Sequence, residues 1–207
     1  MGKTKKADET GEAAEGDGSV FGRGIRFRKW RGVLRSVYDT LGKTEDFVIR
    51  TLVVKGSQRK VYLLYLKSIT DKTVINEYIV EPIINGFFEL PDTSLELDDQ
   101  YIREISLSST DSKELVRRIL QALVSSQCVV ADVEQDRILF IPCSLPQHRQ
   151  VEETDTEPVI RGPHEGFTES LETNVALIRK RIHNPFLRLE PYYIGDETQT
   201  KVLLIYL

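Results

Sequence analysis

The heptapeptide KVYLLYL at residues 60–66 is typical of a β-strand, and the chain contains a near copy of it. Five of its seven positions are identical in KVLLIYL at residues 201–207. Each copy follows a helical pattern, a strand that carries Arg50 or Arg188, and a polar turn. Two short strands can match by chance, but the shared order of elements predicts two α-β-β blocks of one design.

The first block extends in both directions from residues 60–66. An i, i+3, i+4, i+7 pattern predicts a short helix before it, formed by Leu34, Val37, Tyr38 and Leu41. The β-branched run at residues 46–54 predicts the partner strand. A helix over residues 71–84 should follow, capped by Asp71 and disturbed by Pro82.

Further elements are expected between the two blocks. The polar stretch at residues 85–106 should form a loop with short ordered pieces. Asp111 begins a helix, with Glu114 three residues on as in a capping box. A β-hairpin over residues 127–141 comes next.

These patterns predict an α/β fold: two α/β subdomains with mixed sheets flanked by helices. The expected boundaries are a disordered leader at residues 1–28, a first subdomain with a helix-hairpin extension at 29–155, and a second subdomain at 156–207. A strand as apolar as residues 201–207 needs a covering helix, and no helical pattern follows it here. We therefore expect the second subdomain to be truncated and the chain to be an N-terminal piece of a longer protein.

The overall composition is that of an ordinary soluble globular protein, with 40% hydrophobic and 29% charged residues. The net charge of −4 argues against a dedicated nucleic-acid-binding protein, which would be basic. The sequence has no apolar run long enough to cross a bilayer, and its start lacks the hydrophobic stretch of a signal peptide.

A basic and aromatic patch follows the Gly-rich leader. Its members are Arg23, Arg26, Phe27, Arg28, Lys29, Trp30 and Arg31. Such a patch could bind RNA or an anionic membrane surface. In a net-acidic chain we favour the simpler interpretation, a solvated helix entry with two anchoring aromatic side chains.

Cys128 and Cys143 flank the expected hairpin and could face each other in only one strand register. Two reduced, packed thiols are the favoured interpretation. The three histidines do not pair with the cysteines at any ligand spacing, so no metal site is expected.

The run VIRGPHEGFTESLETNVALIRKRI at residues 159–182 combines a tight turn with a helix. The apolar seam of the helix should consist of Leu171, Val175, Ile178 and Ile182. In the turn, Gly162 and Gly166 permit backbone angles that other residues resist, and Pro163 stiffens the bend. The favoured interpretation is a rigid elbow at residues 161–167 that aims the helix.

Two chemical alternatives exist for the same turn. His164 and Glu165 could act as acid and base, but no nucleophile motif accompanies them, so an enzyme is not expected. A glycine turn before a helix could also bind a phosphate or a carboxylate. The Walker spacing is absent, however, and Glu165, Glu169 and Glu172 would repel an anion.

The same run resembles the signature of the A subunits of bacterial spore germinant receptors, the GerA family. The residues that carry the resemblance are Glu157, Pro158, Arg161, Gly162, Pro163, Glu165, Gly166, Phe167, Glu169, Asn174, Leu177, Ile178, Arg179, Arg181 and Ile182. The segments TEDFVIR, NPFLRLEPYYIG and TKVLLIYL are also similar to that family. His164 stands at the variable position of the signature, which counts further against acid–base chemistry.

The resemblance extends over residues 30–207 and directs attention to one set of residues. We interpret the following as the motif of an inter-subdomain joint: Arg161, Gly162, Pro163, Glu165, Gly166, Phe167, Glu169, Asn174 and Arg179.

The resemblance implies a soluble N-terminal region of two α/β subdomains, followed by membrane spans that are missing from this chain. It implies a place at the inner spore membrane, with the soluble domain on the cytoplasmic (spore core) side, beside the B and C subunits of the receptor. It also implies a non-catalytic role without a cofactor, in which the domain couples nutrient sensing to ion release during germination. Accessory family members that act in ion release rather than in sensing share the pattern.

A second hypothesis makes the domain itself a binding module for a small nutrient. An amino acid or a sugar would then lie in the crevice between the subdomains. Nucleic-acid binding through residues 23–31 is a third and less favoured hypothesis.

Overall fold

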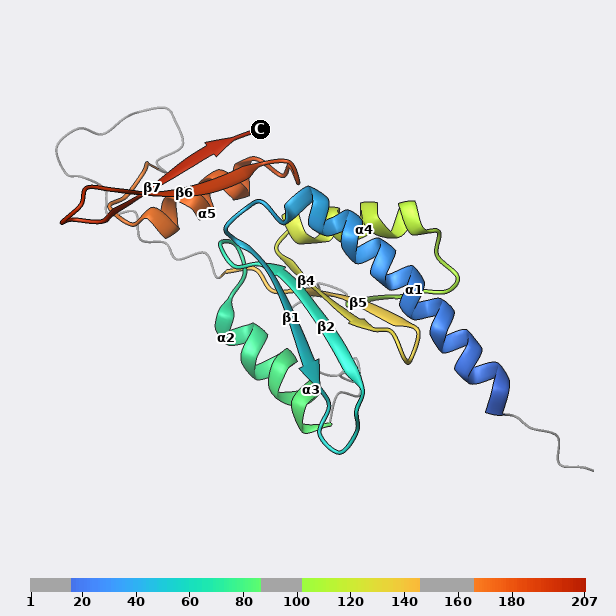
Figure 1. Cartoon of the computed structure of the whole chain (residues 1–207). Helices are drawn as coiled ribbons and strands as arrows, with labels where there is room; N and C mark the ends of the chain where they lie inside the picture. Colours follow the sequence, from blue (N-terminus) through green and yellow to red (C-terminus); the bar gives the residue numbers. More distant parts are fainter. Residues whose placement is uncertain (1–15, 87–101, 146–165) are drawn as a thin grey trace, which may run out of the picture.

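The computed structural model describes residues 16–86, 102–145 and 166–207, which form helices around two β-sheets (Figure 1). In chain order the elements are α1 (Gly16–Leu41), β1 (Phe47–Val53), β2 (Lys60–Leu66), α2 (Lys72–Val74), η1 (Ile75–Val80), α3 (Glu81–Asn85), β3 (Arg103–Ser106), α4 (Ser112–Val124), β4 (Gln127–Asp132), β5 (Arg137–Pro142), α5 (Leu171–Arg181), β6 (Arg188–Ile194) and β7 (Thr200–Tyr206).

The larger sheet has five strands in the order β1-β2-β4-β5-β3, and the smaller sheet pairs β6 with β7. Every pairing between these described strands is antiparallel, so the expectation of mixed sheets was wrong. Short turns join β1 to β2 and β4 to β5, and connections of that length can only join antiparallel neighbours. The α/β class itself is confirmed.

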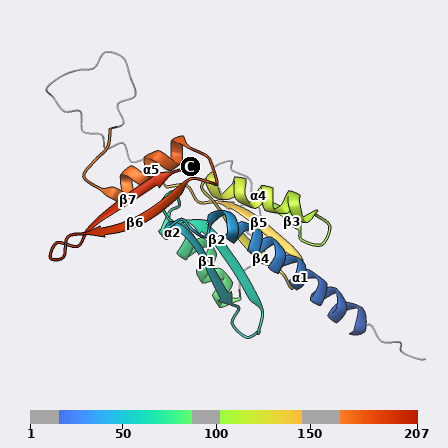
Figure 2. The same cartoon turned by 45° about the horizontal axis from the view of Figure 1, so that its top comes forward.

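Helices cover both faces of the five-stranded sheet. α1 and α4 lie side by side on one face, whereas α2, η1 and α3 run along the other (Figures 1 and 2). Successive residues of β2 point into the two layers, so Leu64 belongs to the core under α1 and α4, and Leu63 to the core under η1. Because β2 is an interior strand buried on both faces, the sequence at residues 60–66 is almost continuously apolar.

α1 begins earlier than the sequence indicated. The helix starts at Gly16, so the part of the predicted leader from this residue onward is helical. Its anchors are the expected aromatic side chains: Trp30 is only 2% exposed, and Phe27 packs against the core. Once these anchors fix the helix, each added residue gains a backbone hydrogen bond, which explains the extension toward the N-terminus.

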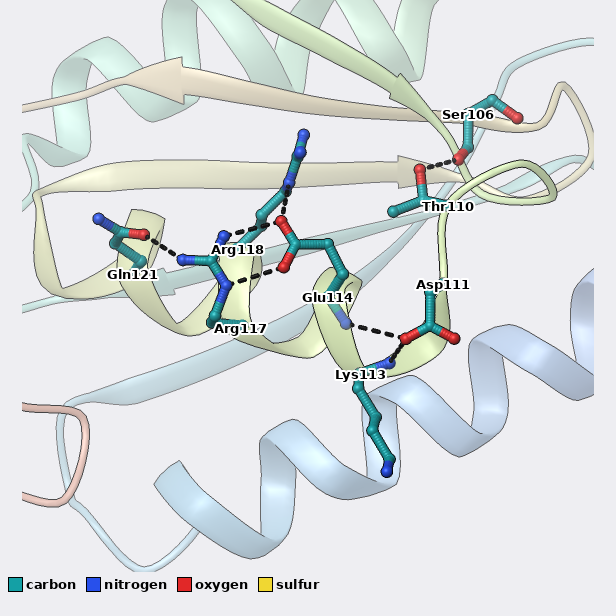
Figure 3. Close-up of polar contacts among 8 residues, drawn as sticks. All are labelled: Ser106, Thr110, Asp111, Lys113, Glu114, Arg117, Arg118 and Gln121. Atoms are coloured by element: carbon teal, nitrogen blue, oxygen red, sulfur yellow. Dashed lines mark hydrogen bonds and ion pairs between the residues drawn. The ribbon is translucent and has the colours of Figure 1, made fainter.

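Two predicted helix starts are confirmed. The carboxylates of Asp71 and Asp111 each accept hydrogen bonds from the backbone N–H groups two and three residues further on. Figure 3 shows the cap at Asp111. The helix after Asp71 contains a π-helical stretch, η1, close before Pro82. Pro82 has no N–H to donate, which disfavours a regular α-helical register at this point.

The predicted hairpin is formed by β4 and β5, and its register places the two cysteines. Gln127 pairs with Pro142, so Cys143 lies diagonally opposite Cys128 on the same face of the sheet. Both thiols are buried and free, and the hydrogen bond between them raises the pKa of Cys128. The interpretation as packed thiols is confirmed.

The second predicted block is the unit of α5, β6 and β7, which has the expected α-β-β order and lies at one end of the five-stranded sheet (Figures 1 and 2). Leu187 and Leu189 at the start of β6 are buried. The rest of the two-stranded sheet is open, with Tyr193 63% and Leu204 50% exposed. No described helix covers residues 201–207 in the way that η1 covers the first block.

We predict that Trp30→Ala lowers the free energy of unfolding by about 3–5 kcal/mol, because it leaves a cavity in the core under α1 and α4. Tyr38→Ala is the matched control: it removes an aromatic side chain from the same helix at a position that is 56% exposed. Its cost should stay below about 1 kcal/mol. Urea unfolding followed by circular dichroism measures both, and equal costs would contradict the assignment of Trp30 as the anchor.

Candidate functional site

The α5–β6–β7 unit is attached to the rest of the described structure through the turn between α1 and β1. Arg179, in the last turn of α5, reaches Asp46 at the end of this turn. Its Nε donates to Oδ2 at 3.0 Å and its Nη2 to Oδ1 at 2.9 Å, a bidentate ion pair. The two residues are 133 positions apart in sequence. We call this pair the Arg179–Asp46 joint.

The acceptor sites of Asp46 are all used. In addition to the two bonds from Arg179, Oδ1 accepts the hydroxyl of Thr44 at 2.8 Å, and Oδ2 accepts the hydroxyl of Ser68. A carboxylate has about four lone-pair sites, so this set saturates it. Ser68 follows β2, and the joint therefore connects α5 with both strands of the β1–β2 pair at the end where Phe47 pairs with Leu66.

Thr44 links the joint to β6. Its hydroxyl donates to Asp46 and accepts two bonds, from Nη2 of Arg179 at 2.9 Å and from the backbone N–H of Leu189 at 3.1 Å. The backbone N–H of Glu45 in turn donates to the carbonyl of Leu189 at 3.0 Å. Arg179 and β6 consequently both form hydrogen bonds with the turn at residues 44–46.

Two solvent-facing ion pairs, both made by Glu45, lie beside these hydrogen bonds. Glu45 accepts a hydrogen bond from Lys201 of β7 at 2.6 Å and lies 3.5 Å from Lys67. Partial burial acts to raise the pKa of Glu45, but the hydrogen bond from Lys201 and the charge of Lys67 outweigh it, so the pKa lies below its usual value. Exposed pairs of this kind contribute little to stability, and we assign these two an orienting role.

The joint lies away from water. The side chains of Arg179 and Asp46 are 1% and 4% exposed, and Nη1 of Arg179 is buried without a hydrogen-bond partner among the described residues. Burying two charges is expensive, and a buried pair of this type adds less net stability than apolar residues of similar volume would. Its value lies in specifying one geometry, since loss of either partner leaves the other charge buried and unpaired.

The predicted motif residues are only partly brought together. Arg161, Gly162, Pro163 and Glu165 lie outside the described residues. Gly166, Phe167 and Glu169 are exposed, with Phe167 at 74%. Among the described residues, a Cβ on Gly166 would meet no atom within 4 Å. Because residues 161–165 lie outside the described ranges, the rigid elbow at residues 161–167 stays a prediction.

Asn174 and Arg179 have defined structural roles. The Asn174 side chain accepts from the backbone N–H of Thr168 at 2.7 Å and donates to its carbonyl at 2.8 Å, which ties the incoming chain to α5. Ser170 caps the helix by accepting the N–H of Thr173. Arg179 then attaches the same helix to the 44–46 turn, so α5 connects the end of the motif with the first sheet.

The predicted apolar seam of α5 is confirmed in part. Of its four members, Val175 is buried, Leu171 and Ile178 are half-buried, and Ile182 is 37% exposed. The other buried residue of the helix is Arg179. Near the end of the helix, the described contacts are those of the ion pair between Arg179 and Asp46 and not those of an apolar layer. This explains why Arg179 is buried there while Ile182 is exposed.

Thr44 and Asp46 were not identified as site residues from the sequence. The signal available was the segment TEDFVIR, in which an acidic residue directly precedes an apolar strand. A carboxylate at such a position is usually solvated, and only the three-dimensional structure brings the guanidinium of Arg179 to it.

Residues 16–86, 102–145 and 166–207 contain no group of three or more His, Cys, Asp and Glu side chains arranged to hold a metal ion. None of the helices in these ranges is both long and apolar enough to cross a membrane.

Comparison with known proteins identifies the family. Residues 35–207 match the family model for the Bacillus/Clostridium GerA spore germination protein. This match covers most of the chain, and the chain belongs to the GerA spore germination family.

Several curated relatives are similar over most of this chain. Spore germination protein GerLA of Bacillus cereus is 27% identical over 175 residues, which are 84% of this chain and 35% of that protein. Spore germination protein XA of Bacillus anthracis is 31% identical over 71% of this chain and 30% of its own length. Stage V sporulation protein AF of Bacillus subtilis is 27% identical over 81% of this chain. The chain spans about a third of the length of these relatives.

A solved structure shares the fold. It is the N-terminal domain of the A subunit of the Bacillus megaterium spore germinant receptor GerK3, with a TM-score of 0.53 and 22% identity. The alignment covers 84% of this chain and 62% of that domain.

We predict that Arg179→Met loosens the attachment of α5 and β6, because it leaves Asp46 buried and unpaired at a cost of about 3–5 kcal/mol. The amide hydrogens of Glu45 and Leu189 should then exchange about a hundredfold faster or more. Hydrogen exchange followed by mass spectrometry or NMR measures this effect. Lys180→Met, which removes the exposed neighbouring charge, is the control and should leave both amides protected; equal exchange in the two variants would refute the joint.

Proposed function

We propose that this chain is the N-terminal domain of a spore germinant receptor A subunit and that it couples nutrient sensing to germination signalling. Membership of the GerA family and the shared fold support the first part. The observation that carries the second part is the buried, bidentate Arg179–Asp46 joint. It allows the two α/β parts to move relative to each other only by breaking a specific contact.

The geometry of the joint suits the transmission of a displacement. A movement of α5 pulls on Arg179, and a movement of β6 or β7 pulls on the 44–46 turn through Leu189 or Lys201. Both inputs converge on Asp46, which is hydrogen-bonded to Ser68 next to β2. Because a buried ion pair is either formed or broken, small forces on the α5–β6–β7 unit would produce two discrete arrangements rather than a continuous range.

The partners follow from the proposal. The B and C subunits of a receptor would apply or receive the force, and membrane spans carried by the full-length protein would place this domain at the inner spore membrane, on the cytoplasmic (spore core) side. A role as an accessory ion-release homologue would use the same joint. One similar protein, Stage V sporulation protein AF, is named for sporulation and not for germination.

Direct binding of a nutrient by this domain is the alternative. It requires a crevice between the two α/β parts. At the joint, however, the space between them is filled by Arg179, Thr44 and Asp46, whose polar groups bind one another. A groove of about 640 Å³ does occur, but it lies between α1 and α4. We therefore favour coupling over ligand binding.

The test is germination of spores whose receptor carries Arg179→Lys in the full-length A subunit. Lysine keeps the charge but cannot form the bidentate contact, so coupling should weaken while the protein still folds. We predict slower germination on nutrient addition, measured as ion release and loss of optical density, at unchanged receptor levels on immunoblots.

The matched control is Lys180→Arg, which should germinate as the unmodified spores do. Wild-type germination of the Arg179→Lys spores, at equal receptor levels, would remove the joint from the signalling mechanism. Family membership would be unaffected by that result.

A further inference from the structure

The exposed face of α1 carries an unusual concentration of positive charge. Residues 23–35 contain no acidic residue and six basic ones, although the whole chain has a net charge of −4: Arg23, Arg26, Arg28, Lys29, Arg31 and Arg35. Two of these have structural partners. Arg26 donates to the carbonyls of Val133 and Glu134, and Lys29 donates to those of Ser108 and Thr110.

Three arginines of the helix have no such role. Arg28, Arg31 and Arg35 are exposed, and their spacing of three and four residues places them along one side of α1. None of the three makes a hydrogen bond or an ion pair with another residue of the described ranges. The acidic residue on the same side is Asp39, at the C-terminal end of the helix. We call Arg28, Arg31 and Arg35 the basic face.

On the neighbouring helix α4, by contrast, exposed arginines form ion pairs with a carboxylate of the same helix. Arg117 and Arg118 of α4 both bind the carboxylate of Glu114 at 2.7 Å (Figure 3). The hydrogen bonds from Arg117 and then Arg118 lower the pKa of Glu114 to about 2. The arginines of α4 therefore have a counter-charge, Glu114, on their own helix. Residues 23–35 of α1 contain no acidic residue that could play this part.

An amphipathic groove adjoins the basic face. It measures about 640 Å³ and lies between α1 and α4. Ile25, Val33 and Val116 provide apolar lining, and Arg28 and Lys113 provide positive charge. Lys113 extends from the start of α4 toward α1 (Figure 3). Ile25 is 53% exposed, so an apolar side chain is open to contact next to the cations.

We propose that the basic face of α1 docks on an anionic phospholipid surface. Guanidinium groups bind phosphate oxygens through paired N–H donors, and a row of them along a helix matches a field of many phosphates. Exposed Ile25 and Tyr38, which flank the row, suit the boundary between headgroups and acyl chains. The choice of a membrane over an acidic protein rests on the proposed function, which places this domain beside a bilayer.

The test is sedimentation of the 207-residue chain with lipid vesicles. We expect binding to vesicles of phosphatidylglycerol mixed with phosphatidylcholine, weakening as salt is added, and none to pure phosphatidylcholine. Arg28→Gln/Arg31→Gln/Arg35→Gln should reduce the affinity about a hundredfold. None of the three side chains pairs with another described residue, so urea unfolding should show an unchanged fold.

The control is Lys55→Gln/Lys60→Gln/Lys72→Gln, which removes the same charge from exposed positions outside α1. An equal loss of affinity in this control would mean that only net charge acts, and would overturn the proposal. Absence of vesicle binding by the unmodified chain would also overturn it, and binding to polyglutamate instead would indicate an acidic protein partner. None of these results depends on germination, so they leave the test of the Arg179–Asp46 joint intact.

Discussion

The contact between Arg179 and Asp46 is the constraint on which the arrangement of this protein depends. Asp46 has all its acceptor sites filled by Arg179, Thr44 and Ser68, and each of these comes from a different part of the chain. One carboxylate thus fixes the end of α5, the turn before β1 and Ser68 beyond β2 in a single geometry. Apolar residues of similar volume would add more net stability, but they would tolerate sliding, which a saturated ion pair does not.

The five-stranded sheet gives this contact a firm base. β2 and β4 lie in the interior of the sheet and are covered on both faces, so the segment that follows β2 cannot shift without disturbing two cores. The α5–β6–β7 unit has no comparable support from the described residues, because much of its two-stranded sheet is exposed. The five-stranded sheet is thus the rigid part, and the α5–β6–β7 unit is the lightly attached part. Because the buried ion pair joins them, a force on the α5–β6–β7 unit would act on the sheet at Asp46.

The sequence predicted those features that depend on neighbouring residues. The caps at Asp71 and Asp111, the strands of residues 60–66 and 201–207 and the hairpin after α4 arise from local side-chain chemistry and periodicity. The burial of Arg179 could not be predicted, because its partner is 133 residues away and a basic residue in a last helical turn is normally solvated. The same limit applied to α1, whose start at Gly16 depends on anchors further along the helix rather than on the Gly-rich residues themselves.

A double-mutant cycle on Asp46→Asn and Arg179→Met measures the energy of the joint most directly. Urea unfolding of the two single variants and of the double variant yields the interaction energy between the two side chains. We expect each single change to cost several times more than the measurement error and the double change to cost much less than their sum, with a coupling of about 2–3 kcal/mol. Additive costs, within about 0.5 kcal/mol, would show that the two charges do not act as a pair and would contradict the role assigned to them.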